Sequence, residues 1–105
     1  MIEPQIWRAL ADPTRRAVFE ALASGEKTVG ELTAGFDISQ PAVSQHLAVL
    51  KEARLVSERR HGRNAFYTIH PGGLQPLAEW IDRYRTDFWP EKIEKLKTVL
   101  KGMDQ

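Results

Sequence analysis

The stretch ISQPAVSQHLAVLKEARLV, from Ile38 to Val56, has the pattern of a helix with one apolar side. Val43, Leu47 and Leu50 recur at i, i+4 and i+7, which places their side chains on one face of a helix. Ser39 stands directly before this run and is a favourable N-cap residue. The spacing therefore predicts a helix over residues 39–53 that packs against a core on one side.

The polar side of this helix has an unusual composition in its first two turns. It carries short hydroxyl and amide side chains where a merely solvated helix usually carries glutamate and lysine: Ser39, Gln40, Ser44 and Gln45. Pro41 is tolerated there because the first turn leaves its N–H groups unpaired in any case. The function of these uncharged side chains can be inferred only together with the elements predicted around the helix.

Three shorter helices are predicted upstream. The first covers about residues 3–11, and the second covers 13–23, with Asp12 as its N-cap and a proline at its first position. Thr28 with Glu31 three residues later forms a capping box that opens a third helix ending near residue 34.

Downstream, the pattern changes to that of a β-hairpin and then returns to helix. Residues 56–60 and 65–69 read as strands around the glycine-containing turn HGRN. Residues 74–101 are helical, and Pro90 predicts a kink or a break near Trp89. The chain is thus mainly α with a small β-hairpin, in the order helix, helix, helix, helix, hairpin, helix. This order predicts one winged helix-turn-helix domain over residues 1–105.

In a winged helix-turn-helix, the polar start of the second motif helix faces the DNA major groove. Serine and glutamine side chains both donate and accept hydrogen bonds, as reading of base edges requires. The charge lies further along, at the hairpin, in Arg59, Arg60 and Arg63, next to Asn64. The chain has a formal net charge of +1, but residues 39–65 hold five basic and two acidic side chains. The expected partner is double-stranded DNA.

The composition excludes several other classes of function. The chain of 105 residues has no cysteine, so disulfides, thiolate metal sites and cysteine nucleophiles are impossible. It has no apolar run long enough to cross a membrane and no secretory signal, so we expect a cytoplasmic protein without a membrane partner. No catalytic motif is present, and we expect no enzyme, no cofactor and no metal site.

Three blocks of the chain resemble the ArsR-type family of prokaryotic winged-helix repressors: LADPTRRAVFEALASGEKTVGEL, ISQPAVSQHLAVLKEARLV and ERRHGRNAFYTI. The resemblance keeps their order and spacing over nearly the whole chain. It implies a homodimer that binds a partly palindromic operator, releases it in response to a signal, and represses its own or a neighbouring operon. The DNA-binding residues that it implies are Ser39, Gln40, Pro41, Ser44, Gln45, His46, Arg59, Arg60, Arg63 and Asn64.

Two features depart from the family pattern. Metal-sensing members carry a cysteine pair in the third helix or histidine and aspartate ligands on the last helix, whereas here the third helix reads ELTAGF and no histidine follows His70. The chain therefore resembles the branch without metal sensing, and the identity of any effector stays open. Arg54 stands where the family usually has glycine, so either Arg54 adopts a left-handed conformation or the helix ends in another way.

Several of these side chains also have simpler interpretations. Gln40, Ser44 and Gln45 could form a solvated face, and the hairpin arginines could merely decorate its tip. His46 could contact a phosphate, donate to a backbone carbonyl within the fold, or lie on the surface. Arg15 could reach a phosphate or pair with Asp12. A winged helix that binds another protein, without specific DNA binding, is the alternative function.

All three tryptophans, Trp7, Trp80 and Trp89, lie in the first or last predicted helix, outside the motif expected to contact DNA. Large aromatic side chains are enriched at protein interfaces. We therefore expect a dimer interface formed by the terminal helices, about residues 3–10 and 74–101. Its expected residues are Trp7, Leu77, Trp80, Ile81, Tyr84 and Phe88.

Overall fold

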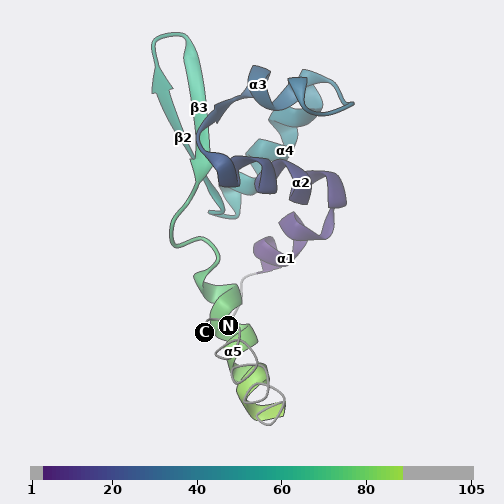
Figure 1. Ribbon diagram of the computed structural model, residues 1–105, viewed down its shortest axis with the longest axis vertical. Coiled ribbons are helices and arrows are strands. Elements are labelled where there is room, and N and C mark those ends of the chain that lie inside the picture. Colours follow the sequence, from purple (N-terminus) through teal and green to yellow (C-terminus); the bar gives the residue numbers. More distant parts are fainter. Residues whose placement is uncertain (1–3, 89–105) are drawn as a thin grey trace, which may run out of the picture. The chain divides into compact units, whose positions relative to one another are not determined.

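The computed structural model describes residues 4–88 of the chain. Its elements follow the predicted order of four helices, a hairpin and a further helix (Figure 1). The helices are α1 (Pro4–Ala11), α2 (Pro13–Ala21), α3 (Val29–Ala34), α4 (Gln40–Glu52) and α5 (Gln75–Phe88). The strands are β1 (Lys27–Thr28), β2 (Val56–His61) and β3 (Asn64–Ile69), and a 3-10 turn, η1 (Leu22–Ser24), continues α2. The residues from α1 to Leu74 form one compact unit, and α5 belongs to a second unit.

Side-chain caps set the start of the three middle helices, as the sequence predicts. The carboxylate of Asp12 accepts a hydrogen bond from the backbone N–H of Arg15 at 3.0 Å and caps α2. Thr28 and Glu31 form the reciprocal capping box of α3. Ser39 caps α4, so that helix begins at the predicted residue. These caps depend on neighbours in sequence, which is why the helix starts are predictable.

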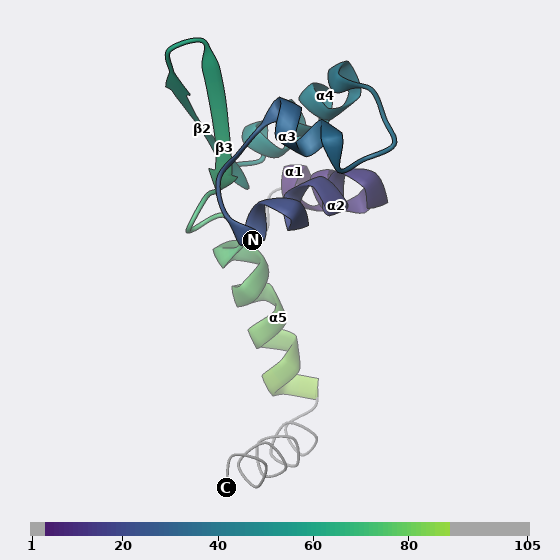
Figure 2. The same cartoon turned by 45° about the horizontal axis from the view of Figure 1, so that its top comes forward.

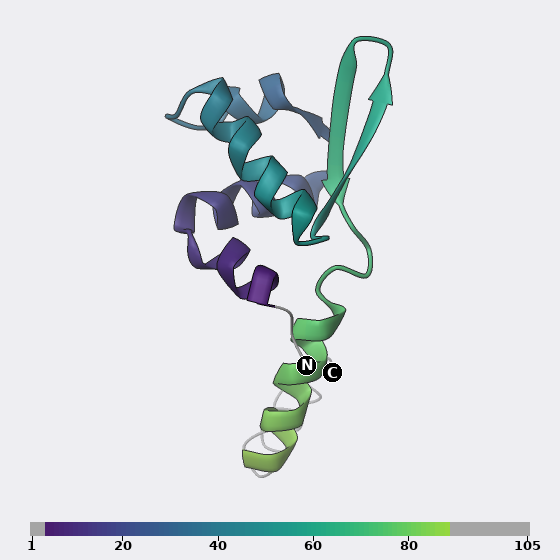
Figure 3. The same ribbon diagram turned by 180° about the vertical axis from the view of Figure 1, so that it is seen from behind.

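The core of the larger unit forms around the apolar side of α4. Val43, Leu47 and Leu50 are completely buried, which confirms the predicted spacing. The same cluster includes buried side chains from α1, α2, η1, α3 and the residue before β2: Ala9, Val18, Phe19, Leu22, Leu32 and Leu55. Helix α4 ends beside the base of the hairpin (Figure 3). The core thereby determines which side chains of α4 reach the surface.

The turn that follows α4 contains a residue with left-handed backbone, Arg54, whose φ is 62°. The N–H of Arg54 donates to the carbonyl of Lys51 at 3.0 Å, and the N–H of Leu55 donates to the carbonyl of Leu50 at 2.9 Å. This pair of bonds is the Schellman motif, in which the left-handed position is usually glycine. Of the two endings that the sequence left open, the chain adopts the left-handed one, because the buried Leu50 and Leu55 hold the turn in place.

Replacing Arg54 with glycine should therefore stabilise the protein. A residue other than glycine in left-handed backbone costs roughly 1–2 kcal/mol of stability, and glycine removes this cost. The extra entropy that glycine loses on folding costs less, about 0.5–1 kcal/mol. We expect the free energy of unfolding in urea to rise by about 0.5–1 kcal/mol. As a control, Glu52→Gly places glycine in right-handed helix and should lower the free energy of unfolding by about the same amount. A loss in both variants would contradict the left-handed ending.

The chain after β3 is held closely against this turn. The N–H of His70 donates to the carbonyl of Leu55 at 2.9 Å. A Cβ atom at Gly73 would lie only 2.6 Å from the carbonyl oxygen of Arg54, so no larger residue fits there without a shift of the backbone. Glycine at this position serves close packing of two backbone segments.

The sheet has three antiparallel strands in the order β1, β3, β2, one more strand than the sequence predicts. The extra strand is only Lys27–Thr28, which pairs with Tyr67 and Phe66 of β3. Two residues are too short to carry an alternating pattern, so nothing in the sequence indicated this strand. The predicted four-residue turn is also shorter, because His61 pairs with Asn64 and only two residues connect the strands. The hairpin, called the wing below, projects beyond the helices α1 to α4 of the same unit (Figure 2).

Helix α5 begins at Gln75 and carries three large exposed side chains. Trp80, Ile81 and Tyr84 are 41%, 46% and 37% exposed. The rings of Trp80 and Tyr84 lie 4.9 Å apart, measured between their centroids. The predicted end of this helix near residue 101, its break at Pro90, Trp89 and the side chain of Phe88 lie outside the described residues.

Candidate nucleic-acid interface

Uncharged polar side chains occupy the exposed side of the first two turns of α4. Gln40, Ser44 and Gln45 are exposed, as is Pro41 in the first turn. Ser39 is exposed as well, and its hydroxyl oxygen accepts from the backbone N–H of Ala42 at 3.3 Å. Because the opposite side of α4 is locked in the core, these side chains have a fixed direction. They form one outward-facing polar surface at the start of the helix.

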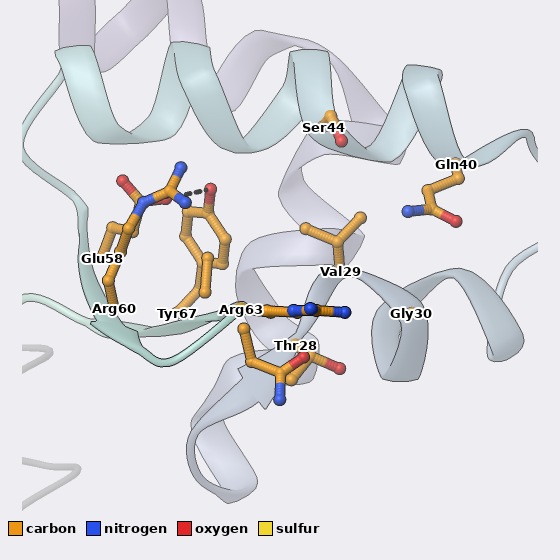
Figure 4. Close-up of a pocket in the computed structure, with 11 residues that line it drawn as sticks. Thr28, Val29, Gly30, Gln40, Ser44, Glu58, Arg60, Arg63 and Tyr67 are labelled. Atoms are coloured by element: carbon orange, nitrogen blue, oxygen red, sulfur yellow. Dashed lines mark hydrogen bonds and ion pairs between the residues drawn. The ribbon is translucent and has the colours of Figure 1, made fainter.

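A polar hollow of about 520 Å³ lies between α4, α3 and the wing. Five of the predicted site residues line it, two from α4 and three from the wing: Gln40, Ser44, Arg60, Arg63 and Asn64. Figure 4 shows Gln40 and Ser44 on the side of α4 and Arg60 and Tyr67 on the side of the wing. We call this space the wing hollow. The fold therefore brings the predicted helix face and the predicted basic hairpin together around one space.

The two neighbouring arginines of β2 point to opposite sides of the wing. Successive residues of a strand face opposite sides of a sheet, and Arg60 lines the wing hollow. Arg59 instead forms two hydrogen bonds with the Glu26 carboxylate, at 2.8 and 3.1 Å, and lies 4.8 Å from the ring centre of Phe66. The hydrogen bond from Arg59 lowers the pKa of Glu26. Arg59 thus connects the wing to the chain before β1.

His46 lies on α4 but is only partly exposed, and it does not line the wing hollow. Its Nδ1 atom is buried and has no hydrogen-bond partner among the described residues. The pKa of the Asp12 carboxyl is lowered, mainly by the backbone hydrogen bond from Arg15 and to a smaller extent by the charge of His46. Nδ1 therefore does not donate to a backbone carbonyl of the described fold, which was one of the three expected roles.

The arginine at the start of α2 has a structural use that sequence reasoning missed. The guanidinium of Arg15 donates to the carbonyl oxygens of Ala9 at 2.8 Å and Arg8 at 3.2 Å. Arg16 donates in the same way to the carbonyl oxygen of Leu10 at 2.7 Å. These arginines satisfy the last carbonyls of α1 and fix it to α2. Asp12 accepts from the backbone N–H of Arg15, and no ion pair between their side chains is formed in the described structure.

Sequence reasoning also missed Glu58 and Tyr67, which line the wing hollow next to Arg60. They are cross-strand partners in the sheet register. The alternation in residues 56–60 and 65–69 would have placed both on one side of the wing, had the register been known.

The residues expected at a dimer interface divide between α1 and α5. Trp7 of α1 is 44% exposed, and Trp80, Ile81 and Tyr84 of α5 are exposed to similar extents. Leu77 is half-buried.

Within residues 4–88, no group of three or more histidine, aspartate or glutamate side chains is arranged to hold a metal ion. None of the helices in that range is long and apolar enough to cross a membrane.

Comparison with known proteins identifies the family. Residues 12–58 match the family model for "Bacterial regulatory protein, arsR family". The chain is 52% identical over 80 residues to the HTH-type transcriptional regulator Rv2034 of Mycobacterium tuberculosis, covering 76% of this chain and 75% of that protein. It is 36% identical over 76 residues to the transcriptional repressor SdpR of Bacillus subtilis, covering 72% of this chain and 84% of that protein.

The fold has solved relatives as well. A crystal structure of a possible transcriptional regulator for arsenical resistance matches with a TM-score of 0.67 and 41% identity, covering 88% of this chain and 92% of that chain. The absence of cysteine agrees with a branch that lacks thiolate metal sensing. The winged helix, the polar face of α4 and these similarities lead to one conclusion: the chain belongs to the ArsR family of bacterial regulatory proteins and is a transcriptional regulator, not an enzyme.

Proposed function

We propose that this regulator is a homodimeric repressor that binds a partly palindromic operator and controls its own or a neighbouring operon. The observation that carries the proposal is the wing hollow, where an uncharged polar helix face stands opposite a basic hairpin. This combination separates side chains suited to reading bases from side chains suited to binding phosphates. The similarity to a protein named a transcriptional repressor supports repression as the outcome.

In this proposal, α4 enters the major groove with its first two turns. The amides of Gln40 and Gln45 can form paired hydrogen bonds to adenine, and the hydroxyl of Ser44 can donate to or accept from several bases. Ser39, Pro41 and His46 lie along the same helix and approach the DNA backbone. The side chains with hydrogen-bonding capacity in both directions are thus placed where sequence is read.

The wing supplies the positive charge in this proposal. Arg60, Arg63 and Asn64 line the wing hollow and contact the phosphates or the adjoining minor groove. Arg59 contributes differently, because its guanidinium is engaged by Glu26 and Phe66 on the other side of the wing. We propose that it orients the wing, and that any phosphate contact it makes competes with Glu26.

Two copies of the chain are expected to pair through α1 and α5. The support is the exposure of Trp80, Ile81 and Tyr84 on one side of α5 and, separately, of Trp7 on α1, since exposed groups of large apolar side chains commonly mark an interface. Leu77 and Phe88 complete the expected set from the same helix. Two α4 helices on one face of the DNA would then read half-sites about 34–36 Å apart. An effector of unknown identity could act by changing this spacing.

Substitutions on α4 and in the wing should have different effects on DNA affinity. We expect Gln40→Ala or Gln45→Ala to weaken operator binding by about 1–3 kcal/mol per half-site and random-sequence binding much less, because base readout is lost. Arg63→Ala should weaken both and reduce the salt dependence by roughly one phosphate contact. The measurement is affinity for a duplex selected by the protein from a random pool, and for a scrambled duplex, across a salt series.

Gln75→Ala, outside α4, is the control and should leave both affinities unchanged. Equal losses on both duplexes for the glutamine variants would show that α4 does not read sequence. An absence of any preference for the selected duplex in the unmodified protein would favour the protein-interaction alternative.

A further inference from the structure

One acidic side chain lies on the face of the wing that is expected to meet DNA. Glu58 of β2 lines the wing hollow together with Arg60 and Arg63, and its side chain is only 15% exposed. A carboxylate facing a polyanion opposes binding by charge repulsion. Its position therefore calls for a function other than contact with DNA.

Both carboxylate oxygens of Glu58 are engaged. Oε1 accepts from the ammonium of Lys51 on α4 at 2.9 Å, and Oε2 accepts from the hydroxyl of Tyr67 on β3 at 3.0 Å. Arg60 lies 3.9 Å from Oε2. Glu58, Arg60 and Tyr67 stand together at one end of the wing hollow (Figure 4). The carboxylate thus joins the last turn of α4 to both strands of the wing.

These contacts and burial shift the pKa values of Glu58 and Tyr67. The hydrogen bond from Lys51 lowers the pKa of Glu58, with a further contribution from Tyr67. Burial raises the pKa of Tyr67, and the hydrogen bond to Glu58 raises it further. At neutral pH, Glu58 is therefore a carboxylate and Tyr67 a neutral phenol that donates to it.

The electrostatic consequence concerns the cations beside Glu58. Lys51 and Arg60 are both exposed, with 54% and 74% of their side-chain surfaces accessible. Unopposed, these two cations would attract the phosphates of any DNA sequence equally, since phosphate contacts carry no sequence information. The negative charge of Glu58 offsets one of the two positive charges of Lys51 and Arg60. It does not affect the hydrogen-bonding capacity of the uncharged glutamines of α4.

We propose that Glu58 is a specificity-determining residue of this regulator, which holds the wing against α4 and suppresses binding to non-cognate DNA. The proposal rests on the proposed DNA-binding function. The carboxylate of Glu58 has two linked effects on DNA binding. Its bonds to Lys51 and Tyr67 keep the wing at the spacing that an operator requires, and its charge limits the attraction that every phosphate backbone shares.

Two isosteric substitutions separate the two effects. Glu58→Gln removes the charge and should strengthen binding to scrambled DNA by roughly two- to tenfold with a steeper salt dependence, because Lys51 and Arg60 are released. Tyr67→Phe removes one donor without changing the charge. It should weaken operator binding by roughly three- to tenfold and leave scrambled binding unchanged. Both variants should lower the ratio of operator to scrambled affinity.

Glu52→Gln is the matched control. It removes a carboxylate from α4, next to Lys51, at an exposed position that does not line the wing hollow, and it should leave the ratio unchanged. A ratio that stays within about twofold of the unmodified protein for Glu58→Gln or Tyr67→Phe would overturn the proposal. Failure of the proposed function itself would look different, because the unmodified protein would then show no operator preference.

A measurement without DNA tests the positioning role independently. Amide hydrogen exchange of β2 and β3 should be faster in Glu58→Gln and Tyr67→Phe than in the unmodified protein, and unchanged in Glu52→Gln. Unchanged exchange in the two wing variants would overturn the proposal even if DNA affinities shifted.

Discussion

Leu47→Ala should lower the free energy of unfolding by about 2–5 kcal/mol, because it leaves a cavity in the centre of the core. Leu47 is completely buried in α4 between Val43 and Leu50. The surrounding side chains come from several helices and can collapse into the space only partly. Much of a small domain's total stability would be lost. Unfolding in urea, followed by circular dichroism at one fixed protein concentration, measures the loss.

The matched control is Leu74→Ala, the same substitution at a position that is 39% exposed. It should cost well under half as much as Leu47→Ala, because little area is removed from the core and no enclosed cavity forms. A loss below about 1 kcal/mol for Leu47→Ala would show that α4 is not held by this packing. The polar face of α4 would then lack the fixed direction on which the proposed base readout depends.

Trp80→Ala should weaken the proposed dimer by about 2–4 kcal/mol, which corresponds to a roughly 30- to 1000-fold rise in its dissociation constant. Trp80 is 41% exposed and lies next to Tyr84 and Ile81 on one side of α5. In a twofold-symmetric dimer each substitution is present twice, so both copies of the contact are lost. Sedimentation across a range of protein concentrations measures the change.

Operator affinity should fall together with dimerisation, because a monomer engages only one half-site. Binding of a single half-site should be unchanged, since Trp80 lies outside the residues that line the wing hollow. Glu79→Ala, on the opposite side of α5, is the control and should leave the dimer intact. An unaltered dimer in both Trp80→Ala and Tyr84→Ala would remove this face of α5 from the interface.

The sequence alone predicted the direction of one half of the proposed DNA-binding surface, the polar side of α4. The polar side of α4 follows from the spacing of Val43, Leu47 and Leu50. Because a helix has a fixed period, the direction of its buried stripe determines the directions of all its remaining side chains. The wing was less predictable. Arg59 and Arg60 are neighbours with the same charge, yet one binds Glu26 and the other lines the wing hollow.

The sequence by itself determined the local features of the structure: the helix caps at Asp12, Thr28 and Ser39, the apolar stripe of α4, and the hairpin. Each of these depends on residues a few positions apart, which interact in any compact state of the chain. Only the tertiary structure decided that Arg15 caps α1, that Arg54 takes the left-handed turn, and that Glu58 joins the wing to α4. These contacts depend on how the core arranges the elements. A side chain's partner across the fold is set by packing and strand register, which no short stretch of sequence contains.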